Sequence, residues 1–482
     1  MTVIDPPSLP LSDAEQRAGR MAAAWVALGM LVMTSFRPQL YIDGDTGWHI
    51  AAGRWILENL AVPRTDSFSF SAPGTRWVAH EWLPEAIMAG SLAIGSWPLL
   101  SLLFGALLGL TVLIIGHEMA RWLDAPKVII ALLTIGVMLL PAILARPHLF
   151  AWPVLALWTV MLLREREANR PPPLRYVLVM LLWANLHGSF IFGLLLAGLF
   201  ALEALISGPD RRAVIIGWGR FGLLALLAGV LPPLGFDGLL HPITITSMNT
   251  LGFISEWQPT QFPRHATFGL ALLFVFSVLL ARGVKVPPVR VLLLGVLLYL
   301  AFIHIRHQPI LALVGGLALA EPLGRSFMRR DTAAPAPWLG KALAALLLLS
   351  LVARLALPSD RPPSGNHPAA AIAWVPETLR RQPVLNEYSF GGSLIFAGIK
   401  PFVDGRADMY GDRFMQPFSR IADGDKVEFD RAVQRWKITW TILMPKSPIV
   451  ARLDADPRWR RAYEDRWAVI HVRRDIKASA KP

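Results

Sequence analysis

Two carboxylates, an imidazole and two tryptophans lie close together in the stretch YIDGDTGWHIAAGRW at residues 41–55. Asp43 and Asp45 are two residues apart, a spacing at which two carboxylates can hold a divalent cation or act as a base and its orienting partner. A second interpretation is capping alone, because an aspartate before a helix often binds the free N–H groups of the first turn. The motif directly follows a long apolar run, which favours a site at the edge of a membrane.

More ionisable side chains stand at the ends of other apolar runs. Arg146 and His148 flank a proline, and Arg306 and His307 follow a later run. Arginine suits a phosphate or diphosphate because its planar guanidinium can donate two parallel hydrogen bonds. These four residues therefore predict phosphate binding beside the membrane, although a simple turn would also explain the proline at 147.

The loop that begins at residue 37 also holds His80 and Glu81, which precede a tryptophan and are either site residues or part of an interface anchor. A zinc site is an alternative for His49 and His80, but the two residues lack a recognisable ligand spacing. Asn185 and His187 are candidates either for the site or for a hydrogen-bonded pair between helices.

Glu256 offers a further carboxylate next to a tryptophan, with an ordinary interface anchor as the alternative. Ionisable groups at membrane depth are costly and by default mark a functional cavity. The candidate substrate- and phosphate-binding residues are therefore His49, His80, Glu81, Arg146, His148, Asn185, His187, Glu256, Arg306 and His307.

Apolar helices are the elements that must position these residues. The chain has 482 residues, of which 54% are hydrophobic and only 17% charged, so long apolar runs dominate it. It has no cysteine, which excludes disulfides and thiolate metal sites. The net charge is +13, and the lysines and arginines that produce it cluster between the apolar runs. This distribution indicates positive-inside topology rather than nucleic-acid binding.

The predicted fold class is an α-helical polytopic membrane protein with about eleven transmembrane helices and a small C-terminal α/β soluble domain. The segment 82–95 is too short for a span, and we expect it to lie in the membrane interface. With the amino terminus inside, every cytoplasmic connection is short and carries lysine or arginine. The expected spans lie near 19–36, 97–118, 127–144, 148–163, 173–187, 189–207, 214–231, 266–281, 288–303, 309–323 and 339–357.

This arrangement divides the chain into a cytoplasmic tail at 1–18, a transmembrane domain at 19–357 with a large outer loop at 37–96, and a water-facing domain at 358–482. In the last domain we expect a helix at DKVEFDRAVQRWK (425–437). The expected strands, bounded by proline, glycine and aspartate, are QPVLNEY (382–388), KPFVDGR (400–406), ITWTILMP (438–445) and WAVIHVRR (467–474).

Two motifs of this domain, NEYSFGGSLIFAG and PFVDGRADMYGDR, supply its site candidates. These are Asn386 and Tyr388 from the first motif and Asp404 and Arg406 from the second. The alternative for the Asp-Gly-Arg segment is a tight turn after a strand.

With these residues placed, the chain resembles the multi-spanning glycosyltransferases of the C-type fold (GT-C). The resemblance rests on an acidic motif directly after the first span (Asp43 and Asp45), a long first outer loop with interface helices at 46–96, roughly a dozen spans, and a soluble C-terminal domain on the same side. The chain departs from the pattern at residues 146–148, Arg-Pro-His, where many members have a second acidic residue. The tail motifs are similar to those of uncharacterised bacterial membrane proteins of this kind.

The resemblance implies a bacterial inner-membrane enzyme with a cytoplasmic amino terminus and a periplasmic C-terminal domain. Such an enzyme transfers a hexosyl or pentosyl group from a polyprenyl-phosphate donor, a membrane lipid, to an acceptor lipid, glycan or protein on the periplasmic side. It implies that Asp43 or Asp45 activates the acceptor or holds Mg²⁺ or Mn²⁺.

Two other functional classes stay open. One is a transporter or flippase of a lipid-linked or anionic substrate, although transporters often show repeated halves and no internal repeat is present. The other is a non-catalytic envelope assembly or sensor protein. The sequence contains no Walker motif, no Gly-x-Ser-x-Gly elbow and no HExxH, which argues against an ATP-driven pump, a serine hydrolase of that type and a zincin protease.

Overall fold

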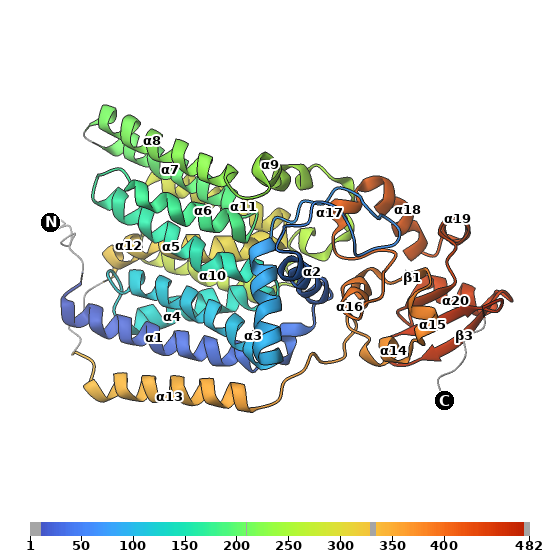
Figure 1. The fold of residues 1–482 in the computed structure, drawn as a ribbon. Helices are drawn as coiled ribbons and strands as arrows, with labels where there is room; N and C mark the ends of the chain where they lie inside the picture. Colours follow the sequence, from blue (N-terminus) through green and yellow to red (C-terminus); the bar gives the residue numbers. More distant parts are fainter. Residues whose placement is uncertain (1–10, 209, 328–333, 477–482) are drawn as a thin grey trace.

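The computed structural model describes residues 11–208, 210–327 and 334–476. Residues 1–10 of the expected N-terminal tail and 477–482 of the expected C-terminal domain lie outside this description. A helical bundle occupies one end of the molecule and a smaller mixed domain the other, with α2 and the loop after it between them (Figure 1).

The bundle is built from helices that match the expected apolar runs. They are α1 (Asp13–Ser35), α3 (Trp82–Met119), α4 (Ala125–Leu139), α5 (His148–Glu167), α6 (Val177–Leu186), α7 (Phe190–Ser207), α8 (Arg211–Val230), α10 (Ala266–Ala281), α11 (Pro288–Ile303), α12 (Gln308–Ser326) and α13 (Pro337–Ala356), while the shorter α2 (Thr46–Asn59) and α9 (Gly235–Thr246) belong to the connections.

Six helices of the described residues are long and apolar enough to cross a membrane by length and composition. They are α1, α3, α4 with the turn after it, α7, α8 and α13. Three further apolar helices are shorter, so the count of eleven spans stays a prediction. On α13 most of the apolar surface is exposed to the surroundings, as expected for a helix that faces lipid.

Helix α3 contains a break between its two halves. Gly95 and Ser96 have non-helical backbone angles, and Ser96 has a φ of +54°. Pro98 cannot donate to the carbonyl of residue 94, which explains a break at this point. The segment expected in the interface, 82–95, is therefore a separate arm that precedes the apolar half, and its depth in the membrane stays a prediction.

The C-terminal domain contains a four-stranded sheet in the order β1-β2-β4-β3. β1 (Val384–Asn386) pairs parallel with β2 (Trp440–Leu443), and β2 and β3 (Trp459–Glu464) each pair antiparallel with β4 (Val469–Arg473). The domain's helices are α14 (Ala369–Trp374), α15 (Glu377–Arg380), α16 (Gly391–Phe396), α17 (Ala407–Tyr410), α18 (Asp412–Ala422), α19 (Lys426–Trp436) and α20 (Pro448–Ala455).

Three of the four expected strands and the helix at 425–437 are confirmed, but the strand expected at 400–406 is wrong. The backbone groups of this segment form hydrogen bonds with the side chain of Asn386 instead of with a neighbouring strand. Phe402 N–H donates to Asn386 Oδ1 (2.8 Å), and Asn386 Nδ2 donates to Val403 O (2.8 Å). The strand that was missed, β3, lies at the sheet edge and carries two arginines and a glutamate. Charged residues are common on edge strands, but they interrupt the alternation of apolar and polar residues by which a strand is recognised in a sequence.

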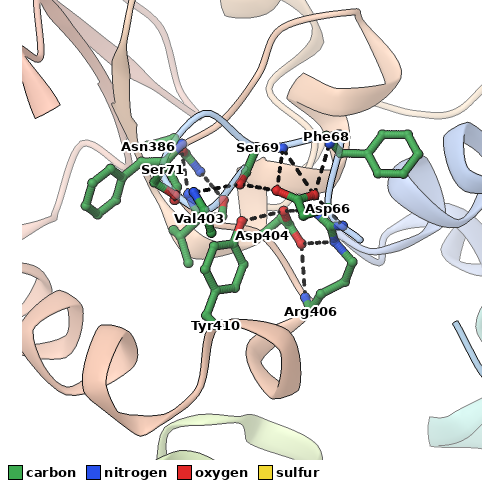
Figure 2. Close-up of polar contacts among 11 residues, drawn as sticks. Asp66, Phe68, Ser69, Ser71, Asn386, Val403, Asp404, Arg406 and Tyr410 are labelled. Atoms are coloured by element: carbon green, nitrogen blue, oxygen red, sulfur yellow. Dashed lines mark hydrogen bonds and ion pairs between the residues drawn. The ribbon is translucent and has the colours of Figure 1, made fainter. Parts of the chain in front are cut away.

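A buried ion-pair cluster joins the C-terminal domain to the loop after α2 (Figure 2). Arg406, 1% exposed, donates to Asp404 through Nε and Nη2 (both 2.7 Å) and to Asp66 through Nη1 (2.8 Å). Tyr410 donates its hydroxyl to Asp404 (2.7 Å). Asp66 also accepts the backbone N–H of Phe68 (2.9 Å). Every charge in the cluster is paired, as burial requires.

Glycines allow the same domain to approach the start of α2 closely. A Cβ on Gly47 would overlap the backbone carbonyl of Gly392, and a Cβ on Gly405 would overlap the carboxylate of Asp45. Gly44, Gly47 and Gly392 are therefore explained by close backbone packing between the start of α2 and residues 389–392, whereas Gly391 approaches the backbone of residues 403–404.

We expect Arg406→Ala to lower the free energy of unfolding by about 3–5 kcal/mol, because it leaves Asp66 and Asp404 buried without a cation. Thermal unfolding of the detergent-solubilised chain measures the effect. The matched control is Arg381→Ala in the same domain, where the arginine is 82% exposed and pairs with Glu377 at the surface, so about 0–1 kcal/mol is expected. Equal losses in the two variants would contradict the structural role of Arg406.

Candidate functional site

Three carboxylates from two connections between helices meet at one arginine from a third. Arg146, which precedes α5, places Nη2 2.8 Å from Asp43 Oδ2 and 2.7 Å from Asp45 Oδ2. Its Nη1 donates to Glu256 Oε2 at 2.6 Å, from the short 3-10 turn Ser255–Trp257. We call these four residues the arginine–carboxylate site. The sequence nominated each of them, and the fold brings them together.

The local backbone turns both aspartates toward Arg146. Asp45 occupies the N-cap position of α2, but its side chain makes no capping hydrogen bond. Its backbone N–H instead donates to Asp43 Oδ1 at 2.7 Å, which holds Asp43 in place. Capping alone is therefore the wrong interpretation of these two residues, because the Asp45 carboxylate points at the guanidinium.

The two aspartates differ in their electrostatics. Burial acts to raise the pKa of Asp43, but the charge and hydrogen bond of Arg146 outweigh it, so the pKa is lowered and the group stays ionised. The pKa of Asp45 is raised to about 7, because burial and the negative charges of Asp43 and Glu256 outweigh the attraction of Arg146. Asp45 thus gains and loses a proton near neutral pH.

Arg146 occupies the place at Asp43 and Asp45 where Mg²⁺ or Mn²⁺ was expected. A single Arg146 nitrogen contacts an oxygen of each carboxylate and supplies the positive charge that a metal ion would bring. A cation bound by both aspartates would have to displace the guanidinium, so the donor set as folded does not fit a metal there.

Arg306 extends the positive charge of the site. Its guanidinium carbon lies 4.2 Å from the centre of the Trp257 ring, and Nη1 is 3.9 Å from Glu256 Oε1. Arg146 Nε is buried and has no hydrogen-bond partner among the described residues. Two guanidinium groups, one with an unused buried donor, therefore lie on either side of Glu256.

Two nominated histidines point away from this site. His148 Nε2 donates to the carbonyl of Ala142 at 2.9 Å, and His307 Nδ1 donates to that of Leu300 at 3.3 Å. Asn185 accepts a hydrogen bond from Trp82 Nε1 at 3.2 Å, which is the helix-to-helix pairing considered from the sequence.

Four further nominated residues, His49, His80, Glu81 and His187, form a second group together with Glu85, which was not nominated. We call these five residues the histidine–glutamate cluster. His49 Nδ1 lies 3.0 Å from Glu85 Oε1 and 3.8 Å from Glu81 Oε2, and His187 Nε2 lies 3.1 Å from Glu81 Oε1. Burial lowers the pKa of His49 to about 3 and that of His80 to about 4, so both imidazoles are neutral at pH 7.

Three members of this region were not nominated from the sequence. Glu85 lies four residues after Glu81, a spacing that places two side chains on the same face of a helix and is visible in the sequence. His241 of α9 stacks near His80, with ring centres 4.6 Å apart, and its Nε2 is 3.3 Å from Asp408 of α17. Only the tertiary fold brings His241 and Asp408 to this place.

The tail candidates have separate roles. Asn386 holds the 402–403 backbone, and Asp404 and Arg406 form the buried cluster of Figure 2. Tyr388 lies close enough to Asp45 and Glu256 for their charges, after burial, to raise its pKa. The tail therefore reaches the arginine–carboxylate site through Tyr388 and the backbone of Gly405.

Comparison with known proteins identifies the fold. No protein-family model matches the sequence, and no curated protein matches it. The archaeal oligosaccharyltransferase AglB from Archaeoglobus fulgidus, in complex with an inhibitory peptide and a dolichol-phosphate, is similar in structure: the TM-score is 0.55 at 10% identity, over 88% of this chain and 69% of that chain. The apo form of the Archaeoglobus fulgidus oligosaccharyltransferase gives 0.54 at 11% identity over the same shares.

At this level of identity the similarity is one of fold. It confirms the predicted class, a polytopic helical membrane protein of the C-type glycosyltransferase fold with a small C-terminal sheet.

Proposed function

We propose that this protein is a membrane glycosyltransferase that takes a sugar from a polyprenyl-phosphate donor and transfers it to an acceptor on the outer side of a bacterial inner membrane. The observation that carries the proposal is the arginine–carboxylate site, where a base with a pKa near 7 lies beside a partly buried arginine. Its place at the outer ends of apolar helices suits a substrate that is itself a lipid.

Arg146 and Arg306 bind the donor phosphate in this scheme. A phosphate oxygen replaces the Asp45 carboxylate as a partner of Arg146, whose free Nε adds a donor. Arg306 reaches the same region across Trp257. Both cations then stabilise the negative charge that grows on the leaving lipid phosphate.

Asp45 removes the proton of the acceptor. The acceptor nucleophile forms a bond to the anomeric carbon of the sugar, the bond from that carbon to the phosphate oxygen breaks, and its electron pair leaves with the lipid phosphate. The proton passes to the Asp45 carboxylate. Asp43, which stays ionised, and Glu256 keep Arg146 oriented during the step.

The chain is proposed to have a cytoplasmic tail at 1–18, a transmembrane domain at 19–357 and a periplasmic domain at 358–482. Lysine and arginine in the short connections at the opposite end from the site support this orientation. The close approach of the C-terminal domain to Asp45 supports a role for that domain in holding the acceptor.

We expect Asp45→Asn to reduce transfer by about 10²–10⁴-fold, the usual contribution of a positioned base. In the wild type the rate should rise with pH through an apparent pKa near 7, since Asp45 must be ionised to accept the proton. The rate is measured with a purified chain, a polyprenyl-phosphate sugar and an acceptor across pH 5–9.

Glu256→Gln provides an internal test of this assignment. Removing its negative charge should lower the pKa of Asp45 and move the acid limb of the profile to lower pH. Glu377→Gln, an exposed carboxylate of the tail, should leave rate and profile unchanged. Full activity in Asp45→Asn would exclude Asp45 as the base. So would a pH–rate profile whose acid limb has the same apparent pKa in Glu256→Gln as in the wild type.

Gly405→Ala should also reduce transfer, by about 10²-fold, because the added methyl overlaps the Asp45 carboxylate and shifts it. Gly365→Ala is the control, since a Cβ there meets only ordinary contacts with Trp467. The same transfer assay compares the two variants, and equal activity would show that Gly405 does not position Asp45.

The experiment that tests the proposed function in cells is lipid and glycan mass spectrometry of a strain that lacks the gene. A missing sugar that returns with the wild-type gene, but not with Asp45→Asn, is the expected result. An unchanged glycan profile with a redistributed lipid would overturn the proposal in favour of transport.

A further inference from the structure

Glu81 and Glu85 are largely buried carboxylates that lack an arginine or lysine partner among the described residues. Glu85 is 1% exposed, and the ion-pair contacts of both glutamates are made only with histidines. The neighbouring arginine–carboxylate site is different, because Arg146 contacts every carboxylate in it. A buried carboxylate is stable when a proton or a cation neutralises it, and no arginine or lysine of the described residues does so in the histidine–glutamate cluster.

The spacing of the ligand atoms suits one small cation. His49 Nδ1, Glu81 and Glu85 each offer a ligand atom, and these atoms lie within 4.8 Å of one another. The separations from His49 Nδ1 are 3.0 Å to Glu85 Oε1 and 3.8 Å to Glu81 Oε2. Ligand bonds of about 2.1 Å in a tetrahedron place neighbouring ligand atoms about 3.4 Å apart, between those two values.

Glu85 carries an independent sign of a missing ligand. Its Oε2 atom is buried and has no hydrogen-bond partner among the described residues. A buried carboxylate oxygen without a partner is rare in folded proteins and calls for an ion, a water or a proton. A cation that bridges Glu85 and His49 would satisfy it.

The histidines around Glu81 are arranged as supports for a metal ligand. His187 Nδ1 accepts the backbone N–H of Ser189 at 3.0 Å, so its proton is on Nε2, which faces Glu81 Oε1 at 3.1 Å and orients the carboxylate. His80 Nδ1 donates to the carbonyl of Val78 at 3.2 Å, which leaves a lone pair on Nε2, 3.8 Å from the same oxygen. Such outer contacts are typical around metal-bound carboxylates.

We propose that the histidine–glutamate cluster binds one divalent first-row transition-metal ion, Zn²⁺ or Mn²⁺, through His49 Nδ1, Glu81 Oε2 and the carboxylate of Glu85, including its unpartnered Oε2. One imidazole with two carboxylates suits these ions better than Mg²⁺ or Ca²⁺, which prefer oxygen ligands alone. His80 Nε2 offers a further lone pair, 3.8 Å from Glu81 Oε1. The ion links α2 to α3 one helical turn beyond Asp45, whose carbonyl accepts the His49 N–H at 3.2 Å.

The test is the metal content of the untagged full-length chain, purified in detergent from cells grown with added Zn²⁺ or Mn²⁺ and dialysed against metal-free buffer. We expect close to one Zn²⁺ or Mn²⁺ per chain by mass spectrometry, and no retained Mg²⁺. His49→Gln and Glu85→Gln should each lower the affinity at least 10-fold. Glu256→Gln, a carboxylate of the neighbouring site, should keep the full metal content.

X-ray absorption at the zinc edge of the wild type tests the ligand set without any variant. One imidazole and carboxylate oxygens are expected, and thiolate ligands are excluded because the chain has no cysteine. A wild type that retains less than about a tenth of an ion per chain would overturn the proposal. So would loss of metal in Glu256→Gln with retention in His49→Gln, which would place the ion at the arginine–carboxylate site. Neither measurement depends on sugar transfer.

Discussion

The contact of Arg146 with three carboxylates is the interaction on which the rest of the site depends. Asp43 and Asp45 come from the loop after α1, Glu256 from the connection after α9, and Arg146 from the turn before α5. One partly buried cation offsets part of the repulsion among three negative charges. Because the compensation is incomplete, the pKa of Asp45 rises into the range of a general base while Asp43 stays ionised.

A second constraint is the close packing of the C-terminal domain on the start of α2. Glycine at 47 and 405 removes the side chains that would separate the two parts, and the Asp66–Arg406–Asp404 ion pairs hold them together (Figure 2). The site is therefore formed jointly by the bundle and the tail. This explains why a domain distant in sequence brings Tyr388 and a glycine next to the candidate base.

The two polar clusters differ in how their charge is balanced. The arginine–carboxylate site contains its own cation, whereas the histidine–glutamate cluster combines carboxylates with neutral imidazoles. The division of roles follows from this difference: the first cluster suits binding an anionic phosphate, and the second suits binding a metal ion. Asp45 precedes the first turn of α2 and His49 lies in it, so a shift of this helix would affect both clusters.

The sequence alone determined the positions of the apolar helices, because a run of that length without charge has few stable alternatives to a helix in lipid. It also determined which polar residues deserve attention, since ionisable groups beside such runs are costly. All four residues of the arginine–carboxylate site and four of the five in the histidine–glutamate cluster were nominated in this way.

The tertiary structure alone decided which candidates meet and what each one does. The site residues are separated by up to about two hundred positions, and no local pattern encodes such contacts. His148 and His307 turned to backbone carbonyls, Asn185 paired with Trp82, and Arg406 became a buried structural cation. The strand expected at 400–406 was lost because a distant side chain, Asn386, satisfies its backbone. Glu85 belongs to the histidine–glutamate cluster because the packing of α3 against α2 places it beside His49, a contact that no local sequence pattern indicates.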